Sequence, residues 1–259
     1  MTQIAGTPAV QDYRTILQRE WASVTRLLAG LTGEKWNQAT RCAGWSILDL
    51  GRHVVWGVSM EADVLRRART GEREPADGTT MTTDSRPHEV LEALNVASGD
   101  LDAEMQRLGP DDGNRTCPMP YGEIPLSLAL EVFVYEAGIH ASDFAHAVGV
   151  DRPLADDVVP PTALVTTQFL PVFASGSTSS PAVGTSFSLK GGSISLDGQW
   201  SADGLVMGDA AEAPSVTVAG DDSAVLLFAA GRLTADDERL TVEGSSDLAR
   251  DFKVYVPGP

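Results

Sequence analysis

Apolar residues recur every three or four positions along the first 150 residues, which is the spacing of one face of an α-helix. The pattern predicts four helices, over residues 13–31, 45–69, 90–108 and 123–149. Loops of unequal length separate these segments. Four such helices in sequence favour a helical bundle with one apolar face of each helix turned inward.

The second helix has the clearest start and end. Ser46 stands where an N-cap is expected, and Asp49 follows it three residues later, as in a capping box. Arg66, Arg67 and Arg69 occupy the last turn, where positive charge complements the helix dipole.

The pattern changes after residue 150. A Gly- and Pro-containing stretch at 149–153 predicts a domain boundary, giving a helical domain over 1–150 and a second domain over 151–259. In the second domain we expect strands at 186–189, 193–196, 215–218 and 240–242, and helices at 162–174, at 221–230 and from Ser245 or Ser246. The predicted fold class is α+β, a four-helix bundle followed by a small mixed α/β domain.

Charge excludes several classes of partner. The chain has 259 residues with 19 Lys and Arg against 36 Asp and Glu, a formal net charge of −17. Such a surface repels nucleic acid and anionic membranes.

No apolar run approaches the roughly 20 residues of a spanning helix, and residues 1–10 show no secretory leader pattern. With two cysteines, Cys42 and Cys117, we expect a cytoplasmic protein without disulfides.

Three side chains on the inward stripes have chemistry that a bundle core does not explain. His53 lies on the apolar stripe of the second helix, and Glu136 and His140, four residues apart, lie on that of the fourth. A buried carboxylate needs a partner, and two imidazoles with one carboxylate suit a divalent ion, zinc above all, with an open coordination position. Taken singly, the Glu-x-x-x-His pair also fits an intrahelical ion pair, and His53 fits a hydrogen-bonded core histidine.

The same segments resemble a known family. Residues 36–53 fit the pattern W…T…C-x-G-W-[ST]-x-x-[DE]-L-x-x-H, and residues 136–143 fit E-x-x-x-H-x-x-D, both of DinB-like four-helix metalloproteins. More narrowly, the chain is similar to the mycothiol-dependent maleylpyruvate isomerases and mycothiol S-transferases, which append a small domain akin to sterol carrier proteins. Segments that look like this appended domain lie at 199–200, 214–221, 226–232 and 240–244.

The resemblance implies roles for individual residues. It assigns a divalent metal, most simply Zn²⁺, to His53, Glu136 and His140, and it suggests that Arg232 binds a substrate carboxylate near the metal. Arg232 also fits a solvated residue beyond a helix end. Asp143 is either a hydrogen-bond partner of a ligand or an exposed charge. Neither Cys42 nor Cys117 is directed at the core by its position, so both are left out of the site.

The expected function is therefore an enzyme that uses a metal to activate a low-molecular-weight thiol, mycothiol by the resemblance. The thiolate would attack an electrophilic small molecule, giving either cis–trans isomerisation or thiol transfer. The residues alone also allow a hydrolase that uses metal-bound water, or a non-catalytic small-molecule-binding protein with a structural metal. The electrophile, the metal and the oligomeric state stay open.

Overall fold

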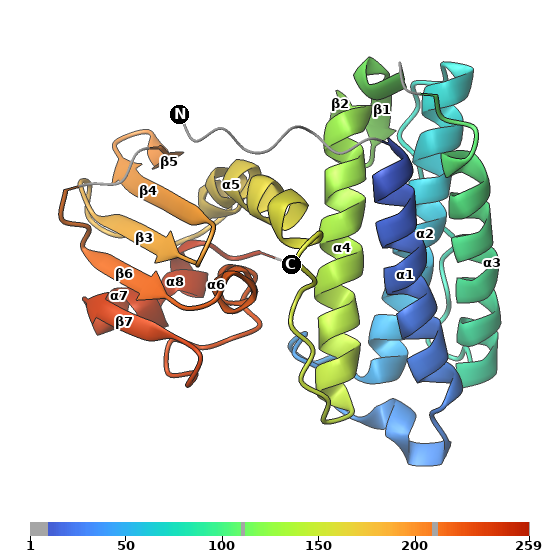
Figure 1. Cartoon of the computed structure of the whole chain (residues 1–259), viewed down its shortest axis with the longest axis horizontal. Helices are drawn as coiled ribbons and strands as arrows, with labels where there is room; N and C mark the ends of the chain where they lie inside the picture. Colours follow the sequence, from blue (N-terminus) through green and yellow to red (C-terminus); the bar gives the residue numbers. More distant parts are fainter. Residues whose placement is uncertain (1–9, 110–111, 209–211, 259) are drawn as a thin grey trace. The chain divides into compact units, whose positions relative to one another are not determined.

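A computed structural model of the chain describes residues 10–109, 112–208 and 212–258. Residues 1–9, which the sequence analysis searched for a secretory leader, lie outside these ranges. The chain divides into two compact units, Met1–Arg152 and Pro153–Pro259. The first is helical and the second contains a five-stranded sheet (Figure 1). The predicted α+β fold class is confirmed.

Four long helices build the first unit: α1 (Val10–Ala29), α2 (Ile47–Thr70), α3 (Pro87–Met105) and α4 (Leu126–Ala147). Short 3₁₀ turns, η1 (Gly33–Asn37) and η2 (Asp112–Asn114), lie in the connections. The helices run side by side, with α1 against α3 and α4 and with α2 against α3 and α4 (Figure 1). Their apolar stripes meet in a core that includes the fully buried Tyr13, Leu50, Leu94 and Phe133. The predicted bundle is therefore confirmed.

The start of α2 follows the predicted capping box. The Ser46 hydroxyl accepts the backbone N–H of Asp49 at 3.2 Å, and the Asp49 carboxylate accepts the backbone N–H of Ser46 at 3.1 Å. The helix ends at Gly71, whose φ of 79° is the left-handed conformation that glycine adopts without a Cβ clash. Both ends of the helix that carries His53 are thus fixed by local chemistry.

The predicted start of the fourth helix near Glu123 is wrong. A short antiparallel hairpin, β1 (Thr116–Met119) paired with β2 (Gly122–Pro125), precedes α4, which begins at Leu126. Two four-residue strands are too short to show a period-two pattern, and both contain proline. The hairpin is hydrogen-bonded to the loop that follows α2, because the Pro118 carbonyl accepts the backbone N–H of Ala76 at 2.9 Å.

The second unit is a sheet in the order β5-β4-β3-β6-β7, in which only the central β3–β6 pair is parallel. Its strands are β3 (Ser186–Lys190), β4 (Ser195–Ser201), β5 (Gly204–Met207), β6 (Val216–Ala219) and β7 (Thr241–Gly244), and its helices are α5 (Val159–Ser175), α6 (Asp222–Ala229), α7 (Ser246–Arg250) and α8 (Phe252–Tyr255). The helices α5, α6 and α7 contact the sheet.

Strands β4 and β5 differ from the sequence prediction. β4 extends to Ser201 instead of ending at residue 196, and β5 was not predicted. Gly198 interrupts the apolar alternation of β4 because the Phe187 ring occupies the space of its side chain; a Cβ there would lie 2.5 Å from that ring. Among the described residues, no helix is long and apolar enough to span a membrane.

Candidate metal centre

His53 stands in the second turn of α2, on the stripe that faces α4. Its ring is half-buried and lies 4.9 Å from the ring of Trp45 and 5.1 Å from the ring of His140, measured between centroids. The His53 and His140 rings meet nearly edge to face, at 81°. Two imidazoles from helices about 90 residues apart in sequence therefore lie in direct contact.

His140 is held from both sides by acidic residues of its own helix. Its Nε2 lies 3.2 Å from Oε2 of Glu136, one turn before it, and its Nδ1 lies 3.1 Å from Oδ2 of Asp143, almost one turn after it. Only 5% of His140 is exposed. The i,i+4 and i,i+3 spacings of a helix place all three side chains on one face.

These positions bring the three residues that the sequence singled out into one group. His53, Glu136 and His140 each offer a ligand atom, and the three atoms lie within 4.8 Å of one another. Two imidazole nitrogens and one carboxylate oxygen are the donor set of zinc sites with an open coordination position. The residues present fit a divalent ion of this kind.

The protonation of His140 reflects its neighbours. Burial would lower its pKa, but hydrogen bonds to Asp143, Cys42 and Glu136 outweigh burial and raise the pKa well above 6.5. With a cation at Nε2, the Nδ1–H bond to Asp143 would keep the ring in the tautomer that presents Nε2 as a ligand atom.

Asp143 and Cys42 form a second layer behind His140. Asp143 is fully buried, so it is a hydrogen-bond partner of His140 and not an exposed helix-end charge. The Cys42 thiol donates to Oδ2 of Asp143 at 3.4 Å, and Cys42, His140 and Asp143 form a second group with metal-ligand spacing. The sequence analysis left Cys42 out of the site, and the structure places its thiol beside Asp143, from the segment directly before α2.

Glu61 is the acidic residue of the site that the sequence analysis missed. It lies two turns after His53 on α2, is 2% exposed, and interacts electrostatically with Glu136 and His140. Burial first, and then the charge of Glu136, raise its pKa well above 4.5. The four-residue spacing of His53, Gly57 and Glu61 puts Glu61 on the same side of α2 as His53, but this spacing does not show that the carboxyl is buried.

Arg232 and Cys117, which the sequence analysis also considered, lie in different units of the chain. Arg232 belongs to the second unit, where it follows α6, is half-buried and donates to the Ala230 carbonyl at 2.8 Å. Cys117 is fully buried in β1, and burial raises the pKa of its thiol to about 12, so this thiol is inert at neutral pH.

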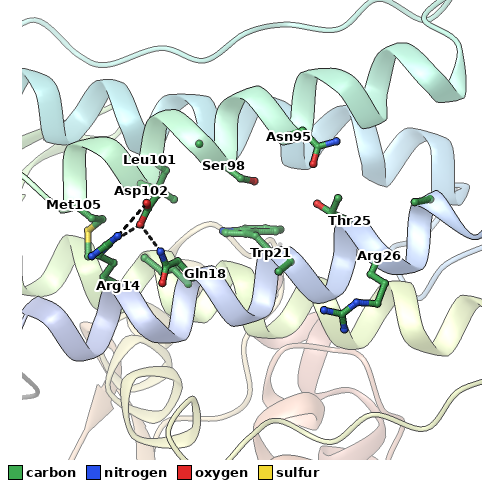
Figure 2. A pocket seen from close by; sticks show the side chains of 14 residues that line it. Arg14, Gln18, Trp21, Thr25, Arg26, Asn95, Ser98, Leu101, Asp102 and Met105 are labelled. Atoms are coloured by element: carbon green, nitrogen blue, oxygen red, sulfur yellow. Dashed lines mark hydrogen bonds and ion pairs between the residues drawn. The ribbon is translucent and has the colours of Figure 1, made fainter.

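A cavity of about 470 Å³ lies between α1 and α3 (Figure 2). Trp21 is one of its lining residues, and at one end Arg14 and Gln18 donate to Asp102, at 2.5 and 2.7 Å (Figure 2). None of the candidate ligands lines it. The metal-ligand group instead joins α2 and α4, so this cavity is separate from the candidate centre.

The fold and the site together define a class of protein: an α+β chain whose four-helix unit carries a His/Glu/His group suited to a metal. Residues 17–145 match the family described as the mycothiol maleylpyruvate isomerase N-terminal domain, and the chain belongs to this family through its helical unit.

Two solved structures share the fold across both units. They are crystal structures of the mycothiol-dependent maleylpyruvate isomerase and of a histidine-to-alanine mutant of it, with TM-scores of 0.67 and 0.66. Each is 16% identical to this chain, and each comparison covers 91% of this chain and 93% of that one. None of the curated proteins matches the chain in sequence.

Proposed function

We propose that the protein is a metal-dependent enzyme that activates a low-molecular-weight thiol, mycothiol, for attack on an electrophilic small molecule. His53, Glu136 and His140 would hold the ion, most simply Zn²⁺. The observation that carries the proposal is the convergence of their ligand atoms within 4.8 Å. The family matched by the helical unit and the solved structure with the same fold support mycothiol as the thiol and isomerisation as the reaction class.

The residues around the group suit this chemistry. A divalent ion bound there would lower the pKa of a thiol, which is about 8.5 in water, and keep it as thiolate at neutral pH. Asp143 holds the His140 ring through Nδ1, so the geometry of the donor set does not depend on the substrate. Trp45 and Trp56 flank His53 and limit the directions from which water reaches it.

The reaction is an addition or a displacement at carbon. In isomerisation the thiolate adds to a cis double bond conjugated to a carbonyl, the electron pair moves to the carbonyl oxygen, the single bond rotates, and expulsion of the thiolate restores the double bond. In thiol transfer the thiolate displaces a leaving group. Arg232 is proposed to bind a carboxylate of the electrophile, since guanidinium groups match carboxylates in geometry and charge.

The test begins with metal analysis of protein purified without chelator and without a histidine tag. We expect one equivalent of divalent metal, and turnover of maleylpyruvate or of an alkylating electrophile only when mycothiol is added. His53→Ala should lose both metal and thiol-dependent turnover, whereas His88→Ala, a histidine at the start of α3 outside the group, should keep both.

Two results would contradict the proposal. Full metal occupancy in His53→Ala would remove His53 from the ligand set. Hydrolysis of an ester or amide by the metal-loaded protein at a rate independent of thiol would favour a metal-dependent hydrolase instead.

A further inference from the structure

A stripe of α2 beyond His53 faces the same site and contains open space. His53, Gly57 and Glu61 follow one another at four-residue intervals, so they lie on one side of the helix over about 12 Å. Glu61 interacts electrostatically with both Glu136 and His140, which places this side of α2 toward α4. A Cβ at Gly57 would meet no atom within 4 Å. Gly57 therefore leaves free space on the side of α2 that carries His53 and Glu61.

One carboxyl oxygen of Glu61 lacks the hydrogen bond that a buried polar atom requires. Glu61 is 2% exposed, and its Oε2 is fully buried without a hydrogen-bond partner in the part of the chain that the structure describes. A buried polar group left unpaired costs about 1–3 kcal/mol, and more when it is charged. Glu61 also lies outside the group of atoms with metal-ligand spacing. Burying this oxygen without a partner therefore costs folding free energy, and metal ligation does not account for it.

The charges around Glu61 decide which molecule suits it. Glu136 interacts electrostatically with Glu61, and both carboxyl groups, after burial of the hydroxyl, raise the pKa of Tyr121. Beside Glu61, these acidic groups disfavour a carboxylate, so the carboxylate of the electrophile is not the group that suits this position. The position accepts an uncharged group with N–H or O–H donors, such as the amides and hydroxyls of a sugar-linked thiol.

We propose that Glu61 and the space at Gly57 form the binding subsite for the polar part of the thiol cosubstrate, with the Glu61 carboxyl accepting an N–H or O–H donor of that thiol. This subsite rests on the proposed function, because it takes the sulfur to lie at the His53, Glu136 and His140 group. It makes Glu61 a residue that selects the thiol and not a metal ligand.

The experiment measures thiol binding without turnover. Protein loaded with Co²⁺ is titrated with mycothiol and with ethanethiol, which has no donor beyond its sulfur, and the thiolate-to-cobalt charge-transfer absorption reports binding. Glu61→Leu should weaken mycothiol about tenfold and leave ethanethiol within twofold, with unchanged cobalt stoichiometry. Glu61→Gln, which keeps an acceptor, should recover part of the loss. Glu131→Gln, at a buried carboxyl bonded to Tyr13, is the matched control.

A second pair of variants tests the space itself. Gly57→Phe should abolish mycothiol binding and retain cobalt, whereas Gly99→Phe, at a helical glycine of α3 that also has open space, should bind like the wild type.

The outcomes separate this inference from the proposed function. If the wild type binds no thiol through cobalt, both fail. If the wild type binds both thiols but Glu61→Leu weakens them equally, or loses cobalt, then Glu61 supports the charge of the metal and the subsite is refuted. Wild-type mycothiol affinity in Glu61→Leu or Gly57→Phe refutes it as well.

Discussion

Asp143 offers the sharpest test of how the candidate centre is organised. Its carboxylate accepts the His140 Nδ1–H at 3.1 Å and the Cys42 thiol at 3.4 Å, and it is completely buried. Replacing it with asparagine preserves the shape and removes the charge. Asparagine can still accept the imidazole N–H, so the change isolates the contribution of charge to the orientation of His140.

The magnitude follows from hydrogen-bond energies. A hydrogen bond to a charged group contributes about 1.5–3 kcal/mol and a neutral one about 0.5–1.5 kcal/mol, so Asp143→Asn should cost about 1–1.5 kcal/mol of metal binding. That is about a tenfold higher dissociation constant. Asp143→Ala also leaves the N–H unpaired and should approach the roughly 100-fold limit known for residues behind metal ligands.

The assay is a competition titration of Zn²⁺ against a chromophoric chelator, with circular dichroism to confirm that each variant is folded. Cys42→Ala removes only the weaker sulfur donor and should change zinc affinity less than about threefold. Zinc affinity within threefold of the wild type in folded Asp143→Ala would refute the orienting role of Asp143.

Three further predictions concern the protonation of His140, two glycines of α2 and the N-cap of the same helix. Because the pKa of His140 is raised above 6.5, protons compete with the metal, and zinc affinity should rise with pH. The metal-free protein should lose stability as pH rises from about 6.5 through that pKa. Equal melting temperatures of the metal-free protein at pH 6.5 and 8 would contradict this. Gly57→Ala should stabilise the protein by about 0.5–1 kcal/mol in urea denaturation, since its Cβ meets no atom, whereas Gly71→Ala, at φ 79°, should destabilise it; the opposite order would show that the space at Gly57 is absent. Ser46→Ala should cost about 1 kcal/mol by removing the cap of α2, measured by thermal denaturation, and a change below 0.3 kcal/mol would count against the capping box.

Local patterns were sufficient to predict much of the fold. The spacing of apolar residues predicted the helical bundle, and the capping box of Ser46 and Asp49 predicted the start of α2. The same periodicity put His53, Glu136 and His140 on inward stripes, and the structure brings these residues together. Such features depend on neighbours within four residues along the chain, which is the range over which a sequence pattern carries direct physical information.

Features that depend on distant contacts were not predictable. Cys42 reaches Asp143 across 101 residues, and nothing near Cys42 in the sequence reports that carboxylate. Glu61 was hidden by its surroundings, because a charged residue on a helix is usually solvated and only the packing of α2 against α4 shows that it is buried. The extent of β4 depended on Phe187 covering Gly198 from the neighbouring strand.

The hairpin before α4 determines where that helix begins and how it is rotated relative to α2. The backbone N–H of Leu126, the first residue of α4, donates to the Arg115 carbonyl at 2.7 Å, and the β1 carbonyl of Pro118 holds the loop that leaves α2. An α-helix turns 100° per residue, so one residue inserted between Leu126 and Glu136 would swing the carboxylate about a quarter of the way around the helix. The rotation of α4 that lets Glu136 face His53 is thus fixed at the N-terminal end of the helix, by backbone hydrogen bonds that do not depend on which side chains are present.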